Sequence, residues 1–165
     1  MGAGKTTVGR SLARRLSKVF LDTDHEIEDR TGVRVSVIFE IEGEEGFRKR
    51  EAEALTRVAC LDNIVLATGG GVVLDPRNRE ILRSQGCVVY LHARPPELAK
   101  RIGKDKSRPL LQGIDPLTRL QELYSLRDPL YREVADLVVD TGRQSVNTLL
   151  GHLLLRLGSE CKPIQ

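Results

Sequence analysis

Short apolar segments that alternate with helical patterns constrain this chain more than any other feature. Each segment is partly β-branched and lacks a clean apolar–polar alternation, which is typical of strands covered on both faces. We therefore predict an α/β fold with a central parallel sheet and right-handed crossovers. The predicted strands are Val19–Asp22, Asn63–Ala67, Gly86–Leu91 and Asp136–Asp140. The predicted helices are Thr6–Lys18, Glu44–Leu61, Pro76–Ser84, Pro95–Ile102, Pro116–Leu126 and Ser145–Leu157, the last with Ser145 as its N-cap.

Size and composition indicate one ordinary domain over residues 1–165. No apolar run approaches the ~20 residues that cross a bilayer, so we expect no membrane partner. The net charge is +3, basic and acidic residues are interleaved and aromatic residues are few, which argues against nucleic acid. Cys60, Cys87 and Cys161 lie far apart, so we expect reduced thiols in a cytoplasmic protein. We also expect the protein to be a monomer.

A phosphate-binding loop stands at the start of the chain, where GAGKTT matches the end of the pattern G-x-x-x-x-G-K-[ST]. Glycines let backbone N–H groups surround phosphate oxygens, and the following helix adds its positive end. Lys5 suits the β- and γ-phosphates, and the hydroxyl of Thr6 suits Mg²⁺. The alternative is a glycine-rich turn before a helix. The predicted phosphate-binding residues are Gly2, Ala3, Gly4, Lys5, Thr6 and Thr7.

The first glycine of this pattern would fall two positions before Met1, and the strand that precedes such a loop would lie further upstream. We therefore expect a sheet that lacks its first, central strand. Its neighbours would lose a hydrogen-bonding partner, which lowers stability, and the loop would be less preorganised for phosphate. An upstream strand and glycine are expected to raise the melting temperature and tighten nucleotide binding.

Two carboxylates follow the first predicted strand, where ligands of open α/β sheets bind. If the backbone stays extended, Asp22 and Asp24 point the same way. One carboxylate would help to hold a hydrated Mg²⁺, and the other would accept a hydrogen bond from a substrate hydroxyl. The alternative is an aspartate-rich turn that caps the next helix.

Two further motifs suit an anionic, close-fitting ligand. Arg48 lies one helical turn before Glu51 and is suited to bidentate binding of a carboxylate; the alternative is a solvated ion pair. The glycines of Thr68–Gly71 follow a buried strand and would let a ligand approach the backbone. A loose turn is the alternative there.

Two arginines could complete the site. Arg108 lies in the basic, turn-rich stretch Lys104–Leu111, which is typical either of a lid over about 104–113 or of a solvated loop. Arg127 precedes Pro129, which is expected to push Asp128 away from helix and to aim the arginine into a cleft. The alternative is a surface arginine near a kink.

Together these motifs resemble the shikimate kinase family. The match consists of GAGKTTVGR, FLDTDHEIE, GEEGFRKRE, VLATGGG, SRPLL and RDPLY in this order, and it extends to about Leu157. The resemblance implies a three-layer P-loop kinase fold related to nucleoside monophosphate kinases, with five parallel strands ordered 2-3-1-4-5. It also implies ATP and Mg²⁺, and shikimate as the substrate that becomes shikimate 3-phosphate on the route to chorismate and aromatic amino acids.

On the acceptor side, the resemblance implies a substrate-binding region of about 24–53. It makes Asp24 the catalytic carboxylate that orients the shikimate hydroxyl and takes its proton late. It makes Arg48 and Arg127 the residues that bind the carboxylate of shikimate, and Gly70 the chief contact of the glycine loop.

On the donor side, the resemblance implies that Lys5 and Arg108 spread the charge of the transferring phosphoryl group. It assigns Mg²⁺ to Thr6 and Asp22, and an edge contact with adenine to Arg143. Two other readings stay open. One is a small nucleoside monophosphate kinase, and the other is a non-catalytic module that binds nucleotide or shikimate.

Overall fold

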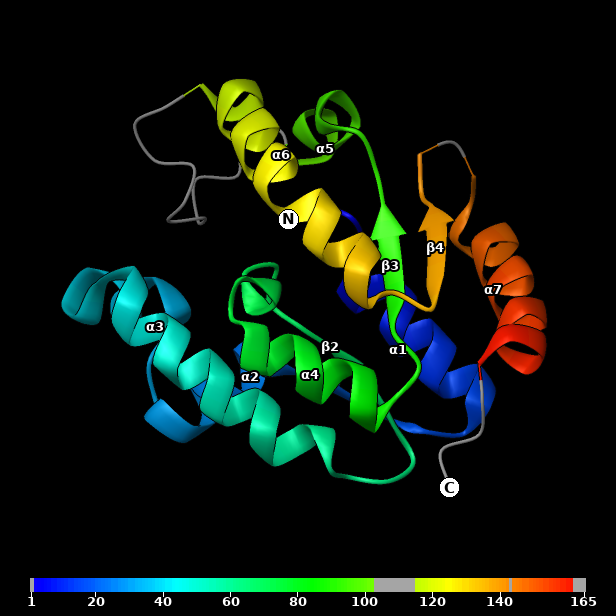
Figure 1. Ribbon diagram of the computed structural model, residues 1–165, viewed down its shortest axis with the longest axis horizontal. Coiled ribbons are helices and arrows are strands. Elements are labelled where there is room, and N and C mark those ends of the chain that lie inside the picture. The colour runs from blue at the N-terminus through cyan, green and yellow to red at the C-terminus, as the bar shows by residue number, and fades with distance from the viewer. Residues whose placement is uncertain (1, 103–114, 143, 162–165) are drawn as a thin grey trace.

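A computed structural model describes residues 2–102, 115–142 and 144–161 of the chain (Figure 1). The predictions for Arg108, Arg143 and the lid at about 104–113 lie outside the described residues. The elements, in chain order, are α1 (Lys5–Leu16), β1 (Val19–Asp22), α2 (Thr23–Thr31), α3 (Val35–Ala59), β2 (Ile64–Ala67), the 3₁₀ helix η1 (Val72–Leu74), α4 (Pro76–Gln85), β3 (Val89–His92), α5 (Pro95–Ile102), α6 (Pro116–Val134), β4 (Leu137–Asp140) and α7 (Val146–Glu160).

The strands form two parallel pairs, which confirms the predicted α/β class. β1 pairs with β2, with Val19 opposite Ile64, and β3 pairs with β4, with Val89 opposite Leu137. No strand of the described residues joins β2 to β3. Parallel pairs place the carboxyl ends of their strands at the same edge. The five-stranded order 2-3-1-4-5 stays a prediction.

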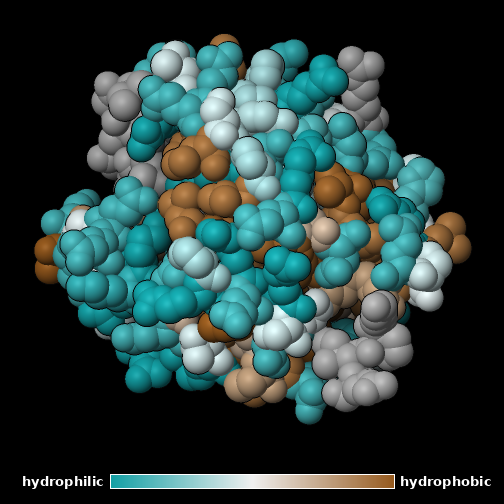
Figure 2. Space-filling model, in the orientation of Figure 1, coloured by the Kyte–Doolittle hydropathy of each residue, from teal (hydrophilic) through white to brown (hydrophobic). Residues whose placement is uncertain are grey.

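Helices bury the sheet. A core cluster unites Val8 and Leu12 of α1 with Leu137 of β4 and with Leu149 and Leu150 of α7. Figure 1 shows α7 beside β4 on the right of the molecule and α2 with α3 on the left. Figure 2 shows a largely hydrophilic face, with hydrophobic residues visible between the polar ones toward its middle. α2 follows β1 directly and packs against α3, so this helical pair begins at the carboxyl end of β1.

Local sequence signals explain where several helices begin. Asp75 and Asp115 accept hydrogen bonds from backbone N–H groups at the starts of α4 and α6, and a proline follows each. Ser145 caps α7 by accepting a hydrogen bond from the Thr148 N–H at 3.2 Å, which confirms its predicted role. These caps satisfy N–H groups that lack partners within the helix.

Three helices differ most from the prediction, and one of them is α3, which begins at Val35 instead of at Glu44. Asp24 lies in α2, which begins directly after β1, so the extended backbone expected for the two aspartates is wrong. α6 runs through Pro129 to Val134, so the expected break at Asp128 is also wrong. A proline inside a helix costs about 3 kcal/mol. Burial of Leu120, Leu123 and Val134 outweighs that cost.

Cysteine pairing corrects another expectation. Cys87 and Cys161 form a disulfide, with their Cα atoms 5.7 Å apart, whereas Cys60 is a free, exposed thiol. The two partners are 74 positions apart in sequence, and the fold brings the segment between α4 and β3 against the end of α7. The positions of the two cysteines in the sequence do not predict that they lie close together in the fold.

Within the described residues, none of the helices combines the length and apolar character needed to cross a membrane.

Candidate functional site

The loop before α1 has the geometry of an anion cradle. Gly2 and Gly4 have φ values of 69° and 86°, in the left-handed region that glycine adopts without strain. No side chain caps α1, and its first turn holds no acidic residue. The positive end of the helix dipole therefore lies at this loop with no acidic side chain of the first turn to offset it, as at known phosphate-binding helix termini. A Cβ at Gly2 would lie 3.0 Å from Cγ1 of Ile102, so the loop packs closely on α5.

The two residues predicted to hold Mg²⁺ are in contact. Thr6 Oγ1 lies 3.2 Å from Asp22 Oδ2, to which it donates a hydrogen bond. The other oxygen, Asp22 Oδ1, accepts a hydrogen bond from the Asp24 N–H at 3.1 Å and so caps α2. Asp22 thus fills the capping role and also faces the phosphate loop. No cluster of three acidic, histidine or cysteine side chains occurs in the described part of the chain.

Asp24 lies in the first turn of α2 and faces the glycine loop. Its Oδ1 is buried without a hydrogen-bond partner, and a Cβ at Gly69 would lie 3.2 Å from that atom. Burial raises the pKa of Asp24, and the charge of Asp22 adds to the rise, whereas Lys5 and Arg48 oppose it. A carboxylate with a raised pKa is a stronger base than an ordinary aspartate.

Arg48 is held by two glutamates of its own helix. Its Nη1 donates to Glu51 Oε2 at 2.7 Å, and its Nη2 donates to Glu44 Oε1 at 2.8 Å. Glu51 is completely buried, so the solvated ion pair that the sequence left open is wrong. Burial raises the pKa of Glu51, while the Arg48 charge and hydrogen bond counteract the rise.

The glycine loop is packed between these side chains. The Gly69 N–H donates to Thr23 Oγ1 at 3.0 Å, and the Gly70 carbonyl accepts a hydrogen bond from the Tyr131 hydroxyl. A Cβ at Gly69 would overlap Glu51, and one at Gly71 would overlap the guanidinium of Arg48. The loop is therefore not a loose turn, because its glycines are required by close approach.

Arg127 reaches the same place from α6. It is only 5% exposed, so it is not a surface arginine, and its Nε is buried without a hydrogen-bond partner. Its charge acts on both Glu51 and Tyr131. Predicted residues from α2, α3, the glycine loop and α6 therefore converge around one point.

A model of the shikimate kinase family matches residues 1–157 of the chain. The chain belongs to the shikimate kinase family. A shikimate kinase from Burkholderia lata is 59% identical, and the match covers 100% of this chain and 91% of that protein. A shikimate kinase from Thiobacillus denitrificans is 60% identical over 88% of this chain and 80% of its own length.

Solved shikimate kinases share the fold. The structure of the Acinetobacter baumannii enzyme in complex with shikimate matches with a TM-score of 0.93 at 47% identity, covering 96% of this chain and 89% of that one. The enzyme from Bacteroides thetaiotaomicron matches with a TM-score of 0.88 at 32% identity, covering 96% and 94%. These likenesses place the chain in the P-loop kinase fold of the shikimate kinase family.

Sequence reasoning missed the burial of Glu51. Its position carried a signal, because the buried residues of α3 recur at helical spacing. They are Ile38, Phe47, Glu51, Ala54, Leu55 and Val58. Glu51 therefore stands in the apolar stripe of the helix, where a carboxylate needs a partner. Thr23 and Tyr131, which contact the glycine loop, were also missed.

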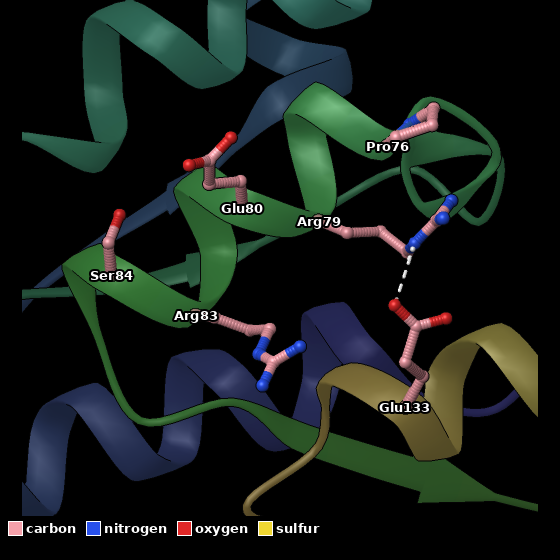
Figure 3. A pocket seen from close by; sticks show the side chains of 6 residues that line it. All are labelled: Pro76, Arg79, Glu80, Arg83, Ser84 and Glu133. Carbon is pink, nitrogen blue, oxygen red and sulfur yellow. Dashed lines mark hydrogen bonds and ion pairs between the residues drawn. The ribbon is translucent and has the colours of Figure 1, made fainter.

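A surface hollow of about 370 Å³ lies elsewhere, between α4 and α6 (Figure 3). Arg79 crosses it to contact Glu133, with 3.2 Å between Nε and Oε1. Its remaining lining residues are Pro76, Glu80, Arg83 and Ser84. It contains none of the residues matched to the shikimate kinase motifs, so we do not assign the reaction to it.

Proposed function

We propose that this chain transfers the γ-phosphate of ATP to the 3-hydroxyl of shikimate, giving ADP and shikimate 3-phosphate for the route to chorismate. One observation carries the proposal. Asp24 Oδ1, Glu51 Oε1 and Arg127 Nε are buried without hydrogen-bond partners, and all three belong to the site around the glycine loop. An unpaired buried polar group costs about 1–3 kcal/mol. A small ligand with hydroxyls and a carboxylate would satisfy both acceptors and the donor.

The two arginines suit the carboxylate of such a ligand. Arg48 presents a guanidinium already oriented by Glu44 and Glu51, and Arg127 presents a buried donor without a partner. Planar guanidinium groups bind carboxylates in a bidentate manner. Their binding would orient the ring so that one hydroxyl faces Asp24. The glycine loop, chiefly Gly70, would approach the other face of the ring.

Asp24 would orient the attacking hydroxyl and accept its proton. Its raised pKa supports that role, because general bases work best when their pKa lies near the operating pH. Phosphoryl transfer otherwise depends on positioning and charge stabilisation rather than on covalent chemistry. The Asp24 oxygen without a partner is therefore the one that would receive the hydroxyl hydrogen.

The donor side would bind ATP through the backbone of Gly2, Ala3 and Gly4 and through the first turn of α1. Lys5 would reach the β- and γ-phosphates. Thr6 and Asp22 would hold Mg²⁺, which when bound neutralises developing charge on the phosphates. Thr7 would add a further donor from the first turn.

The family resemblance supports further assignments outside the described residues. Arg108, in the proposed lid over about 104–113, would contact the transferring phosphoryl group, and Arg143 would lie at the adenine edge. We also propose one domain over 1–165 with an acceptor region of about 24–53. We further propose that the protein works in the cytoplasm, where ATP is available as the donor, and that it is a monomer.

The test is ADP release in a coupled assay with ATP, Mg²⁺ and one acceptor at a time. Turnover with shikimate, and none with AMP or CMP, would support the proposal. Turnover with AMP or CMP instead would favour a nucleoside monophosphate kinase. Binding of nucleotide or shikimate without any turnover would identify a non-catalytic module.

A further inference from the structure

A tyrosine of α6 contacts the loop that faces the proposed acceptor. The Tyr131 hydroxyl donates a hydrogen bond to the carbonyl oxygen of Gly70. Arg127, one turn earlier on α6, presents its guanidinium to the same site. One helix therefore carries both an arginine of the proposed carboxylate clamp and the anchor of the glycine loop.

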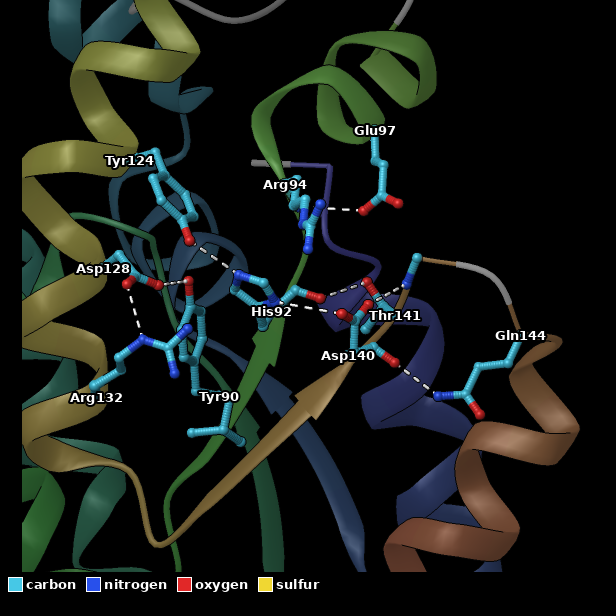
Figure 4. A network of polar contacts seen from close by, with 12 residues as sticks. Tyr90, His92, Arg94, Glu97, Tyr124, Asp128, Arg132, Asp140, Thr141 and Gln144 are labelled. Carbon is cyan, nitrogen blue, oxygen red and sulfur yellow. Dashed lines mark hydrogen bonds and ion pairs between the residues drawn. The ribbon is translucent and has the colours of Figure 1, made fainter.

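The ring of Tyr131 is itself held in place. It lies against the ring of Tyr90, with 4.8 Å between the two centroids and 34° between the planes. Tyr90 donates from its hydroxyl to Asp128 Oδ1 at 2.9 Å, and Arg132 Nε donates to Asp128 Oδ2 at 2.8 Å (Figure 4). β3 and α6 thus fix the direction in which the Tyr131 hydroxyl points.

The Gly70 carbonyl shares a peptide unit with the N–H of Gly71. That unit is planar and trans, so fixing the carbonyl also fixes the opposite direction of the N–H. Gly71 itself packs on the Arg48 guanidinium. Burial raises the pKa of the Tyr131 phenol, so the hydroxyl stays protonated and donates at neutral pH.

We propose that Tyr131 is a positioning residue for the acceptor substrate, because its hydroxyl sets the orientation of the Gly70–Gly71 peptide between Arg48 and Arg127. The inference rests on the proposed function. Tyr131 acts through the loop and through the side chain of Arg127, which its hydroxyl also contacts, and it takes no part in proton or phosphoryl transfer. It sets the affinity for shikimate and leaves the ATP side of the site unchanged.

The experiment compares Tyr131→Phe with Tyr124→Phe. The first removes the hydroxyl that reaches Gly70 and keeps the ring against Tyr90. The second removes a hydroxyl of the same helix that contacts His92 Nε2 at 3.0 Å. The readouts are the shikimate Kd by calorimetry, the KM values for shikimate and ATP, kcat and the melting temperature.

Because Tyr131→Phe loses one hydrogen bond, we expect the Kd and KM for shikimate to rise about 3- to 10-fold in this variant. The KM for ATP and kcat should stay near the wild-type values, and Tyr124→Phe should resemble the wild type throughout. A shikimate Kd unchanged in Tyr131→Phe would overturn the inference. So would an equal loss of both affinities together with a lower melting temperature, because that pattern marks a merely structural role.

The calorimetric readout separates this inference from the proposed function. A wild type that binds shikimate, with equal affinity in Tyr131→Phe, would overturn the positioning role alone. A wild type that neither binds nor phosphorylates shikimate would overturn both.

Discussion

Nη1 of Arg48 lies 2.7 Å from Oε2 of Glu51, and that glutamate is completely buried. Removing two charges from water is costly, and the attraction between them compensates only when geometry and hydrogen bonding are good. Here the pair orients a guanidinium toward the glycine loop before any ligand arrives. An arginine held in this way loses little conformational freedom when it binds a carboxylate.

The first prediction concerns the shape of that guanidinium. Arg48→Lys keeps the charge but loses the planar, bidentate donor set. We expect the KM for shikimate to rise about 10- to 100-fold, because one or more charge-assisted hydrogen bonds are lost. The affinity for ATP should stay largely unchanged. Steady-state kinetics with each substrate varied in turn measure both.

Arg50→Lys is the matched control, because Arg50 lies on the same helix and pairs with Glu42 on the surface. It should leave the kinetics unchanged. Wild-type kinetics for shikimate in Arg48→Lys would remove Arg48 from the site.

The second prediction concerns the proposed base. Asp24→Asn is nearly isosteric but cannot accept a proton, so kcat should fall by ~10²–10⁴-fold. Asp29→Asn, at an exposed position of the same helix, should retain wild-type turnover. The measurement is kcat at saturating substrates, with circular dichroism to check folding. A wild-type kcat in Asp24→Asn would exclude the assigned role.

The third prediction concerns stability and pH. The pKa of Asp24 is raised, so the folded state binds the proton more tightly than the unfolded chain. The stability from that proton is fully present below the ordinary carboxyl pKa and is lost as pH rises through the raised value. Asp24→Asn, which is neutral at every pH, should therefore melt higher than the wild type at pH 8 and nearly equally at pH 4. Thermal melts across this range measure the difference.

An equal or lower melting temperature for Asp24→Asn at pH 8 would contradict this account. The expected result would make Asp24 a residue kept for activity at a cost in stability.

The fourth prediction concerns space at the glycine loop. A Cβ at Gly71 would overlap the Arg48 guanidinium, so Gly71→Ala should displace Arg48 and raise the KM for shikimate several-fold or more. Gly86→Ala is the control, because a Cβ added at Gly86 would have no other atom within 4 Å and the backbone there is extended. A normal KM in Gly71→Ala would show that Arg48 can move aside without loss.

The sequence predicted the four strands well because each is a short apolar run between helical patterns. β1 matches its predicted bounds, and β2 and β4 begin one residue later than predicted. β3 differs most, because it runs over Val89–His92 instead of the predicted Gly86–Leu91. α2 was missed because it is almost entirely polar, with Thr23 and Ile27 as its buried residues. Its amphipathic signal is therefore weak, and tertiary contacts with α3 hold it.

The candidate site was predicted in part. Arg48, Asp24 and the glycine loop were found through motifs, and the structure brings them together. The role of Tyr131 depends on a contact between distant segments, because 61 positions separate it from Gly70. Long-range pairing of this kind leaves no local pattern in the sequence. The disulfide between Cys87 and Cys161 was missed for the same reason.

The column of rings between β3 and α6 gives the protein an optical property. The chain contains no tryptophan and three tyrosines, at positions 90, 124 and 131. Two of these rings stack on each other, and the third contacts His92, whose ring meets Tyr90 edge-on. Ultraviolet fluorescence excited in tyrosine therefore arises from one strip of the molecule between β3 and α6, which touches the glycine loop through Tyr131.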